Sequence, residues 1–180
     1  MGEVYTGAAD VIAWLGEESE DSDLAFEAID ALPKSDQVHW DPGVAPSVSP
    51  EMRSMRHLQA LQRLLQRPWW QRVWTVQESI LGNNMHFVCG SRKCSAESLF
   101  SLCQSFFHHV NSCCFNFSRI ECGRLARVLH FTLVTIYHLA AMRKAIHRSG
   151  IDVIMSLHRA RECTDPRDKV FGFLGRTIDA

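Results

Sequence analysis

The 180-residue sequence predicts an α/β fold that is rich in helix and contains a small, mostly parallel sheet. Two short apolar runs, 11–15 and 85–89, are bounded by turn residues, which is typical of strands buried on both faces. Elsewhere apolar residues recur at intervals of three and four, which indicates amphipathic helices. Because two strands make a very small sheet, the sequence also predicts further strands or an incomplete domain.

The amino-terminal elements follow from spacing and turn residues. Helical spacing of apolar residues at 4–9 predicts a short helix directly before the strand at 11–15. An acidic loop at 17–23 precedes a second helix, which should end at Pro33 because proline cannot continue a helix. Residues 33–50 hold four of the six prolines and predict an exposed loop, and 52–65 predict a further amphipathic helix.

Residues 67–78 contain three tryptophans and end on a carboxylate. Tryptophan is costly to leave in water, so this segment should belong to the core. Pro68 suits the first turn of a helix. The stripe that predicts one continuous helix consists of Trp70, Val73, Trp74, Gln77, Ile80 and Leu81. Glu78 lies beside this stripe. A carboxylate packed against tryptophan side chains either has hydrogen-bond or ionic partners or serves a functional role.

The second half is predicted to be mainly helical. After a turn at 82–84 and the strand at 85–89, Ser95 should cap a helix, and 119–148 should form a long, interrupted helix. A short helix is expected at 151–159. Asp165 followed by Pro166 predicts the cap and first position of a final helix that ends at Gly175.

Charge and hydropathy exclude two classes of partner. The formal net charge is −1 and no basic run is present, which argues against a protein that binds nucleic acid or a membrane surface. The longest apolar stretch, 125–142, contains Arg127, His130 and His138, so it should not span a membrane. Its apolar stripe instead predicts a helix that faces the core.

Seven irregularly spaced cysteines predict reduced thiols in a cytoplasmic protein. The adjacent Cys113 and Cys114, with His108 and His109 nearby, could suggest a zinc site. However, the sequence has no CxxC pair, so we expect buried, apolar cysteines and no metal ion.

Three separated segments resemble the fungal heterokaryon-incompatibility (HET) domain: 1–16, with its Trp-Leu-Gly end; 68–78, with Trp-Trp-Gln-Arg-Val-Trp-Thr-Val-Gln-Glu; and 164–175, with Asp-Pro-Arg-Asp-Lys-Val. Family members usually carry further strands upstream. The resemblance therefore implies that the amino-terminal part of the domain is missing, that 1–100 form its carboxy-terminal portion, and that 101–180 form a helical extension.

The resemblance implies a role in fungal non-self recognition and programmed cell death. The expected partners are other signalling or death-pathway proteins and further copies of the chain. No cofactor is implied with certainty. The signature residues that the resemblance assigns to this sequence are Trp14, Trp70, Arg72, Trp74, Gln77, Asp165, Arg167 and Asp168.

The resemblance also implies a remote relation to flavodoxin-like Toll/interleukin-receptor (TIR) domains, some of which cleave NAD. Glu78 matches the glutamate that such enzymes present to the nicotinamide riboside, so NAD is a possible substrate. A tryptophan could then stack on a base of NAD. The alternative is that Glu78 pairs with Arg72 or Arg167 and only fixes its helix. With part of the domain missing, we expect the chain alone to be inactive as an enzyme.

Overall fold

The structure is a computed structural model that describes residues 2–32, 39, 55–114, 123–144, 155–156 and 158–174. Its sheet has the order β1-β2-β3, in which β1 (Asp10–Trp14) pairs in parallel with β2 (Asn84–Cys89) and β2 pairs antiparallel with β3 (Arg92–Ser95). The helix-rich α/β class is confirmed, and the small sheet is mixed. The sequence prediction missed β3, because Arg92 and Lys93 interrupt any apolar run.

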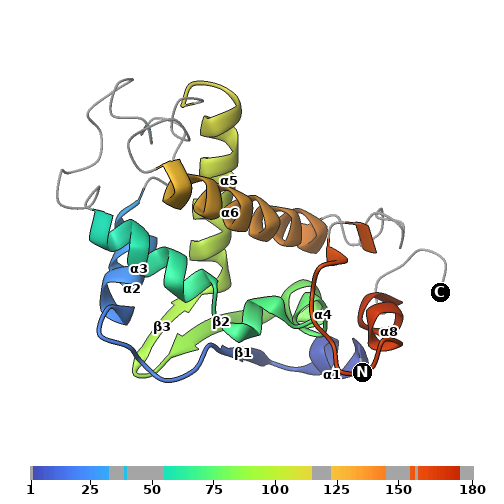
Figure 1. Cartoon of the computed structure of the whole chain (residues 1–180). Helices are drawn as coiled ribbons and strands as arrows, with labels where there is room; N and C mark the ends of the chain where they lie inside the picture. The colour runs from blue at the N-terminus through green and yellow to red at the C-terminus, as the bar shows by residue number, and fades with distance from the viewer. Residues whose placement is uncertain are drawn as a thin grey trace.

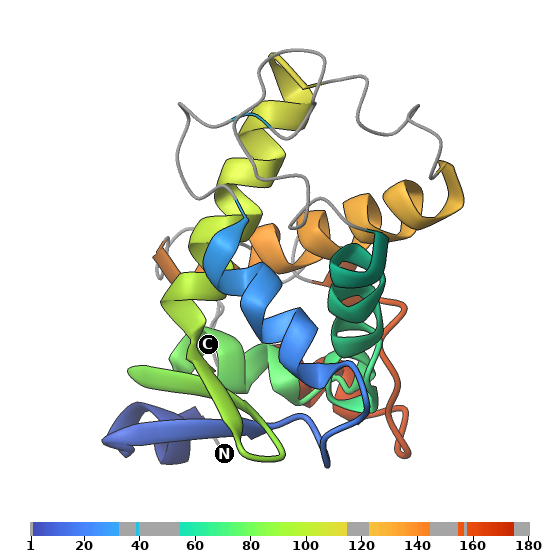
Figure 2. The same cartoon turned by 90° about the vertical axis from the view of Figure 1, so that its left-hand side faces the viewer.

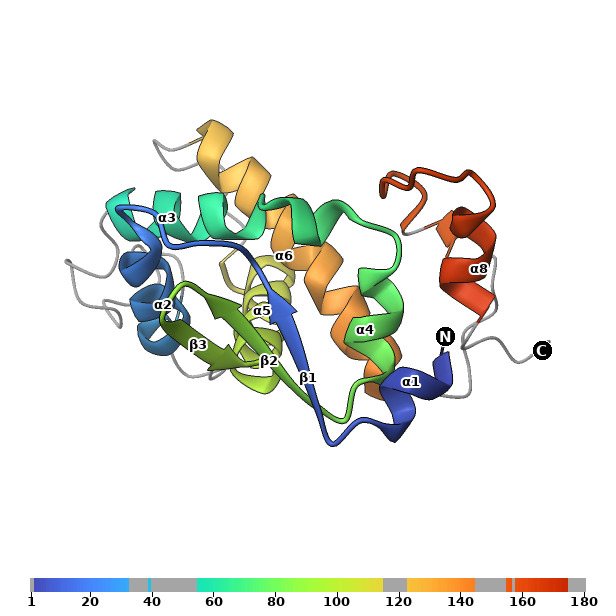
Figure 3. The same cartoon turned by 90° about the horizontal axis from the view of Figure 1, so that it is seen from below.

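Among the described residues, helices cover one face of this sheet and leave the other open. Seen from below, the strands lie in front of α5 and α6 (Figure 3). Along β1, Val11 and Ala13 are buried, whereas Ile12 is 65% exposed and Trp14 is 48% exposed. The prediction that this strand is buried on both faces is therefore wrong, because side chains alternate between the faces and the packed helices lie on one side only.

The predicted helices are present with shifted ends (Figure 1). Their bounds are α1 (Gly2–Gly7), α2 (Ser22–Ala31), α3 (Met55–Leu65), α5 (Ala96–Asn111), α6 (Gly123–Lys144) and α8 (Asp168–Leu174). The side view in Figure 2 shows α2 and α3 packed next to each other. Apart from His39, the predicted loop at 33–50 lies outside the described residues, as do both ends of the predicted helix at 119–148 and most of 151–159.

The tryptophan segment is not one helix. Residues Pro68–Gln71 form a single 3₁₀ turn, η1, and α4 (Thr75–Leu81) begins after a break at Arg72, whose backbone is extended. The break allows a short parallel pairing with residue 162: the Val73 amide donates to the Glu162 carbonyl at 2.9 Å, and the Glu162 amide donates to the Gln71 carbonyl at 2.6 Å. The prediction of a continuous helix is wrong because this distant pairing replaces the helical bonds of the missing turn.

The core lies between the covered face of the sheet and the helices. Trp69 and Trp70 are both buried there and pack against Phe87 of β2, with ring centroids 5.4 and 4.9 Å apart. On α6, Leu129 and Ile136 belong to this cluster, whereas Leu139 belongs to a second cluster with α4. The predicted core role of the tryptophan segment and the apolar stripe of α6 are thus confirmed.

Two further expectations are tested by the helices. The Ser95 hydroxyl accepts the Ser98 amide at 3.0 Å, which confirms the predicted cap of α5. Among the helices that the structure describes, none is long and apolar enough to cross a membrane.

Candidate functional site: the α4 junction

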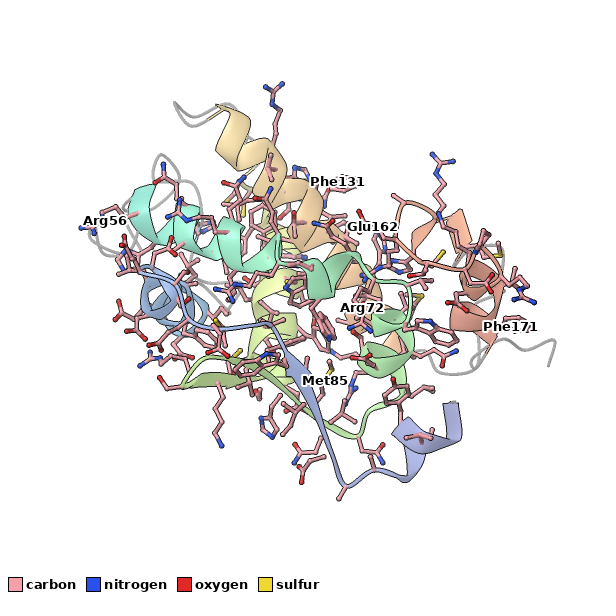
Figure 4. The ribbon with its side chains drawn as sticks, turned by 60° about the horizontal axis from the view of Figure 1, so that its bottom comes forward. Arg56, Arg72, Met85, Phe131, Glu162 and Phe171 are labelled. Carbon is pink, nitrogen blue, oxygen red and sulfur yellow. The ribbon has the colours of Figure 1, made fainter. Side chains whose placement is uncertain are left out.

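Short α4 is the element on which distant parts of the chain meet. From α8, the Asp168 carboxylate accepts the Trp74 indole N–H at 3.2 Å, and the Phe171 carbonyl accepts the Gln77 amide at 2.8 Å. From α1, Tyr5 reaches Glu78. Figure 4 labels Arg72 and Glu162, which lie on adjoining segments, and Phe171 on α8. We call this arrangement of α1, η1, α4 and α8 the α4 junction.

Gly172 allows α8 to approach the start of the α4 junction closely. A Cβ atom on Gly172 would lie 2.9 Å from Cγ2 of Val73, which is closer than carbon atoms pack. Val73 is buried and β-branched, so its methyl group has little freedom to move. Gly172 therefore has a steric role.

Replacing Gly172 with alanine should lower the free energy of unfolding by about 1–2 kcal/mol, because the overlap outweighs the usual gain of alanine in a helix. Urea denaturation of the Gly172→Ala variant measures this. The matched control is Gly7→Ala, since a Cβ there meets nothing within 4 Å. The loss should shrink in a Val73→Ala background; an equal loss in both backgrounds would show that the contact is not responsible.

Glu78 is held by neutral hydrogen-bond donors. The Trp69 indole N–H donates to Oε2 at 3.0 Å, and the Tyr5 hydroxyl donates to Oε1 at 3.4 Å. Burial, together with the charge of Glu78 and the hydrogen bond to it, raises the pKa of Tyr5. Within the described residues, neither Arg72 nor Arg167 forms an ion pair with Glu78. The carboxylate thus joins α4 to η1 and α1 and stays partly exposed.

Arg167 has a different partner. It donates to both carboxylate oxygens of Asp165, at distances down to 2.6 Å, in a pair that is largely exposed. The hydrogen bonds from Arg167 lower the pKa of Asp165. Asp165 also accepts the Arg167 amide, so these residues form a turn, and α8 begins only at Asp168. The prediction that Pro166 occupies the first helical position is therefore wrong by two residues.

Arg161 is a central residue that the sequence did not point to. Its side chain is buried, and its guanidinium donates from Nη1 to the Trp70 carbonyl at 2.7 Å and to the Arg72 carbonyl at 3.2 Å. The same nitrogen donates to the Thr75 hydroxyl at 2.8 Å. These acceptors surround the break between η1 and α4, where carbonyls have no helical partners. In the sequence Arg161 is only an arginine next to Glu162. Its role becomes visible once Glu162 pairs with Arg72 at the break between η1 and α4.

Not every residue of the predicted signature lies at the α4 junction. Trp74, Gln77 and Asp168 meet there, whereas Trp70 belongs to the core and donates to the Leu64 carbonyl at 3.1 Å. Trp14 lies on the open face of the sheet at the end of β1. Gln77 keeps a buried oxygen, Oε1, without a hydrogen-bond partner among the described residues.

A depression of about 400 Å³ lies beyond the end of α4. Arg143 lines it and donates to the Ser79 carbonyl at 2.9 Å, which satisfies a carbonyl near the end of that helix. Lys144 also lines it and donates to the Gln104 side chain at 3.2 Å. Glu78 is not among the lining residues, so the candidate carboxylate and this depression are separate features.

A comparison with known protein families gives a match, which covers the amino-terminal segments of the chain. Residues 1–78 match the model of the family described as heterokaryon incompatibility protein (HET). No curated protein and no solved structure matches the chain. The match contains α1, β1 and η1 and ends at Glu78 in α4, and the block at 164–174 packs against its last helix. The amino-terminal 78 residues of this chain are therefore similar to the heterokaryon-incompatibility (HET) family.

Proposed function

We propose that the chain acts as a signalling module in heterokaryon incompatibility, where its association with other proteins triggers programmed cell death after fungal non-self recognition. The observation that carries this proposal is the HET match that ends within the α4 junction. The downstream segment 164–174 closes on the matched segment through Trp74 and Gln77.

The open face of the sheet supplies a surface for association. Ile12 and Trp14 are large apolar side chains that the packed helices leave exposed. In the described sheet, β1 is also an edge strand, whose backbone is open to pairing with another chain. Exposed apolar side chains at a strand edge are typical of protein interaction surfaces. The partner class is therefore another signalling protein or a second copy of the chain.

A second candidate function is cleavage of NAD by Glu78. One observation favours it: the carboxylate is partly exposed and, among the described residues, has no cationic partner that would neutralise it. Breaking the N-glycosidic bond of NAD develops positive charge on the ribose, and an anionic carboxylate can stabilise that charge. In the signalling proposal, the same carboxylate acts only as an acceptor for Trp69 and Tyr5.

The Glu78→Gln variant separates the two functions. Glutamine keeps an oxygen that can accept a bond from Trp69, but it removes the negative charge. We expect this variant to retain cell killing when the chain is expressed from an inducible promoter in a filamentous fungus. Viability staining and total NAD, measured on the same cultures, are the two readouts. The matched control is Glu162→Gln, which changes the same chemical group at an exposed position.

Loss of both killing and NAD consumption in Glu78→Gln, with both kept in Glu162→Gln, would establish the enzymatic function and overturn the signalling proposal. If cultures that express the native chain die without any fall in total NAD, the enzymatic function is excluded. Soluble expression of each variant, checked by immunoblot, separates loss of function from loss of the protein.

A further inference from the structure

Four side chains that could bind metal converge at the end of α5, far from the α4 junction. They are His39, His109, Cys113 and Cys114, and their ligand atoms all lie within 4.8 Å of one another. His109 and Cys114 are buried, whereas His39 and Cys113 are half-buried. Three of these residues come from one short stretch, and His39 comes from 74 residues before Cys113.

The distance between the two sulfurs and the distances from the Cys114 sulfur are close to those of a tetrahedral zinc site, whereas the Cys113 sulfur lies closer to both nitrogens. Around Zn²⁺, with bonds of about 2.3 Å to sulfur and about 2.0–2.1 Å to nitrogen, two sulfurs lie about 3.8 Å apart and a sulfur and a nitrogen about 3.6 Å apart. Here the two Sγ atoms are 3.7 Å apart. The Cys113 sulfur lies 3.2 and 3.0 Å from the Nδ1 atoms of His39 and His109. The Cys114 sulfur lies 3.7 and 3.8 Å from the same atoms.

The backbone after α5 brings the three later ligands together. The His109 carbonyl accepts the amides of Ser112, Cys113 and Cys114, at 3.2, 3.1 and 2.6 Å. This tight turn folds both cysteines back over the imidazole of His109, which lies in the last turn of α5. The rings of His39 and His109 meet edge to face, with centroids 5.2 Å apart, and the Nδ1 atom of each ring lies next to the Cys113 sulfur.

We propose that these four residues form a structural zinc site of the Cys₂His₂ type. Two thiolates and two neutral imidazoles balance the charge of Zn²⁺, and binding releases the two thiol protons to solvent. Four protein ligands leave no open position for a substrate, which distinguishes a structural from a catalytic site. A tetrahedral S₂N₂ set suits zinc better than the harder ions that prefer oxygen.

The site would hold residue 39 against the end of α5. His39 follows α2 in the chain, so one metal ion would tie the connection between α2 and α3 to a helix that comes later. Sequence spacing could not show this, because the motif has no CxxC pair and its fourth ligand is distant in the chain. The proposal therefore departs from the sequence prediction of no metal, and it is independent of the proposed signalling function.

Metal content of the purified 180-residue chain tests the proposal. We expect about one zinc per chain by mass spectrometry of the metal, as for a closed four-ligand site. Replacing zinc with Co²⁺ should give the intense visible bands and the sulfur-to-cobalt charge transfer of tetrahedral thiolate coordination. His39→Ala and Cys113→Ser should each weaken Co²⁺ binding by more than the roughly 10–100-fold typical of losing an outer-shell partner.

Two matched controls should bind metal like the native chain. His108→Ala removes an exposed histidine next to His109, and Cys163→Ser removes a thiol outside the cluster. The cobalt spectrum of the native chain is informative even if one variant fails to fold. Any of three results would overturn the proposal. The native chain could be metal-free and give no tetrahedral cobalt spectrum, or it could hold a disulfide between Cys113 and Cys114 in the reduced preparation. The third is that His39→Ala and Cys113→Ser bind metal as the native chain does.

Discussion

Replacing Arg161 with alanine should destabilise the protein by about 3–4 kcal/mol, the range expected for breaking a buried network of charge-assisted hydrogen bonds. The guanidinium donates to the carbonyls of Trp70 and Arg72 and to the Thr75 hydroxyl, and its Nε donates to His158 at 3.3 Å. Without it, carbonyls at the break between η1 and α4 lose a buried partner. Urea denaturation followed by tryptophan fluorescence measures the change directly.

Arg159→Ala is the matched control, because Arg159 is exposed and lies only two residues away. It should alter the free energy of unfolding by no more than about 0.5 kcal/mol. Arg161→Lys should recover only part of the loss, since an ammonium cannot reproduce the planar set of donors. Equal stability of Arg161→Ala and Arg159→Ala would show that the break does not depend on the guanidinium.

The protein should lose about 2 kcal/mol of stability between about pH 7 and about pH 5 through His158 alone. Burial, and then the charges of Arg161 and His138, lower the pKa of His158 from 6.5 to about 3 in the folded protein. In the unfolded chain His158 binds a proton as the pH falls through about 6.5, whereas in the folded protein the His158 imidazole stays neutral until about pH 3. The contribution is therefore fully present above the unfolded pKa and is lost progressively as the pH falls.

Parallel urea denaturations at the two pH values measure this effect. The His158→Asn variant removes the titrating group while offering Arg161 an acceptor, so its stability should fall less between the two pH values than that of the native chain. His108→Asn serves as the control, because His108 is exposed and should leave the pH dependence unchanged. Identical pH dependence in the native chain and His158→Asn would contradict the account of His158.

Local patterns predicted most elements, because the periodicity of 3.6 residues is visible wherever a helix packs one face on the core. The apolar stripes of α2, α3 and α6 are of this kind. A signal for β3 was also present: Gly90 and Ser91 form a two-residue hairpin loop, and Gly90 has a φ of +53°. The charged residues of β3 concealed it, since they satisfy neither apolar pattern.

Long-range contacts could not be predicted in the same way. The partner of Glu78 in α1, Tyr5, is 73 residues away, and Arg161 lies 91 residues from Trp70. The same stripe that marked 70–81 as helical concealed the break at Arg72, because the residues on both sides of it still face the core. Periodicity reports which residues are buried, but it does not report which distant backbone they pair with.

The most direct test of the central claim is cell killing by the Glu78→Gln variant. Total NAD is measured in the same cultures, and Arg161→Ala is tested in parallel. We claim that the α4 junction acts through its fold and not through the charge of one carboxylate. Glu78→Gln should therefore kill as the native chain does, with NAD unchanged before viability falls, whereas Arg161→Ala should lose killing together with stability. Abolished killing and NAD loss in a stably folded Glu78→Gln variant would contradict that claim.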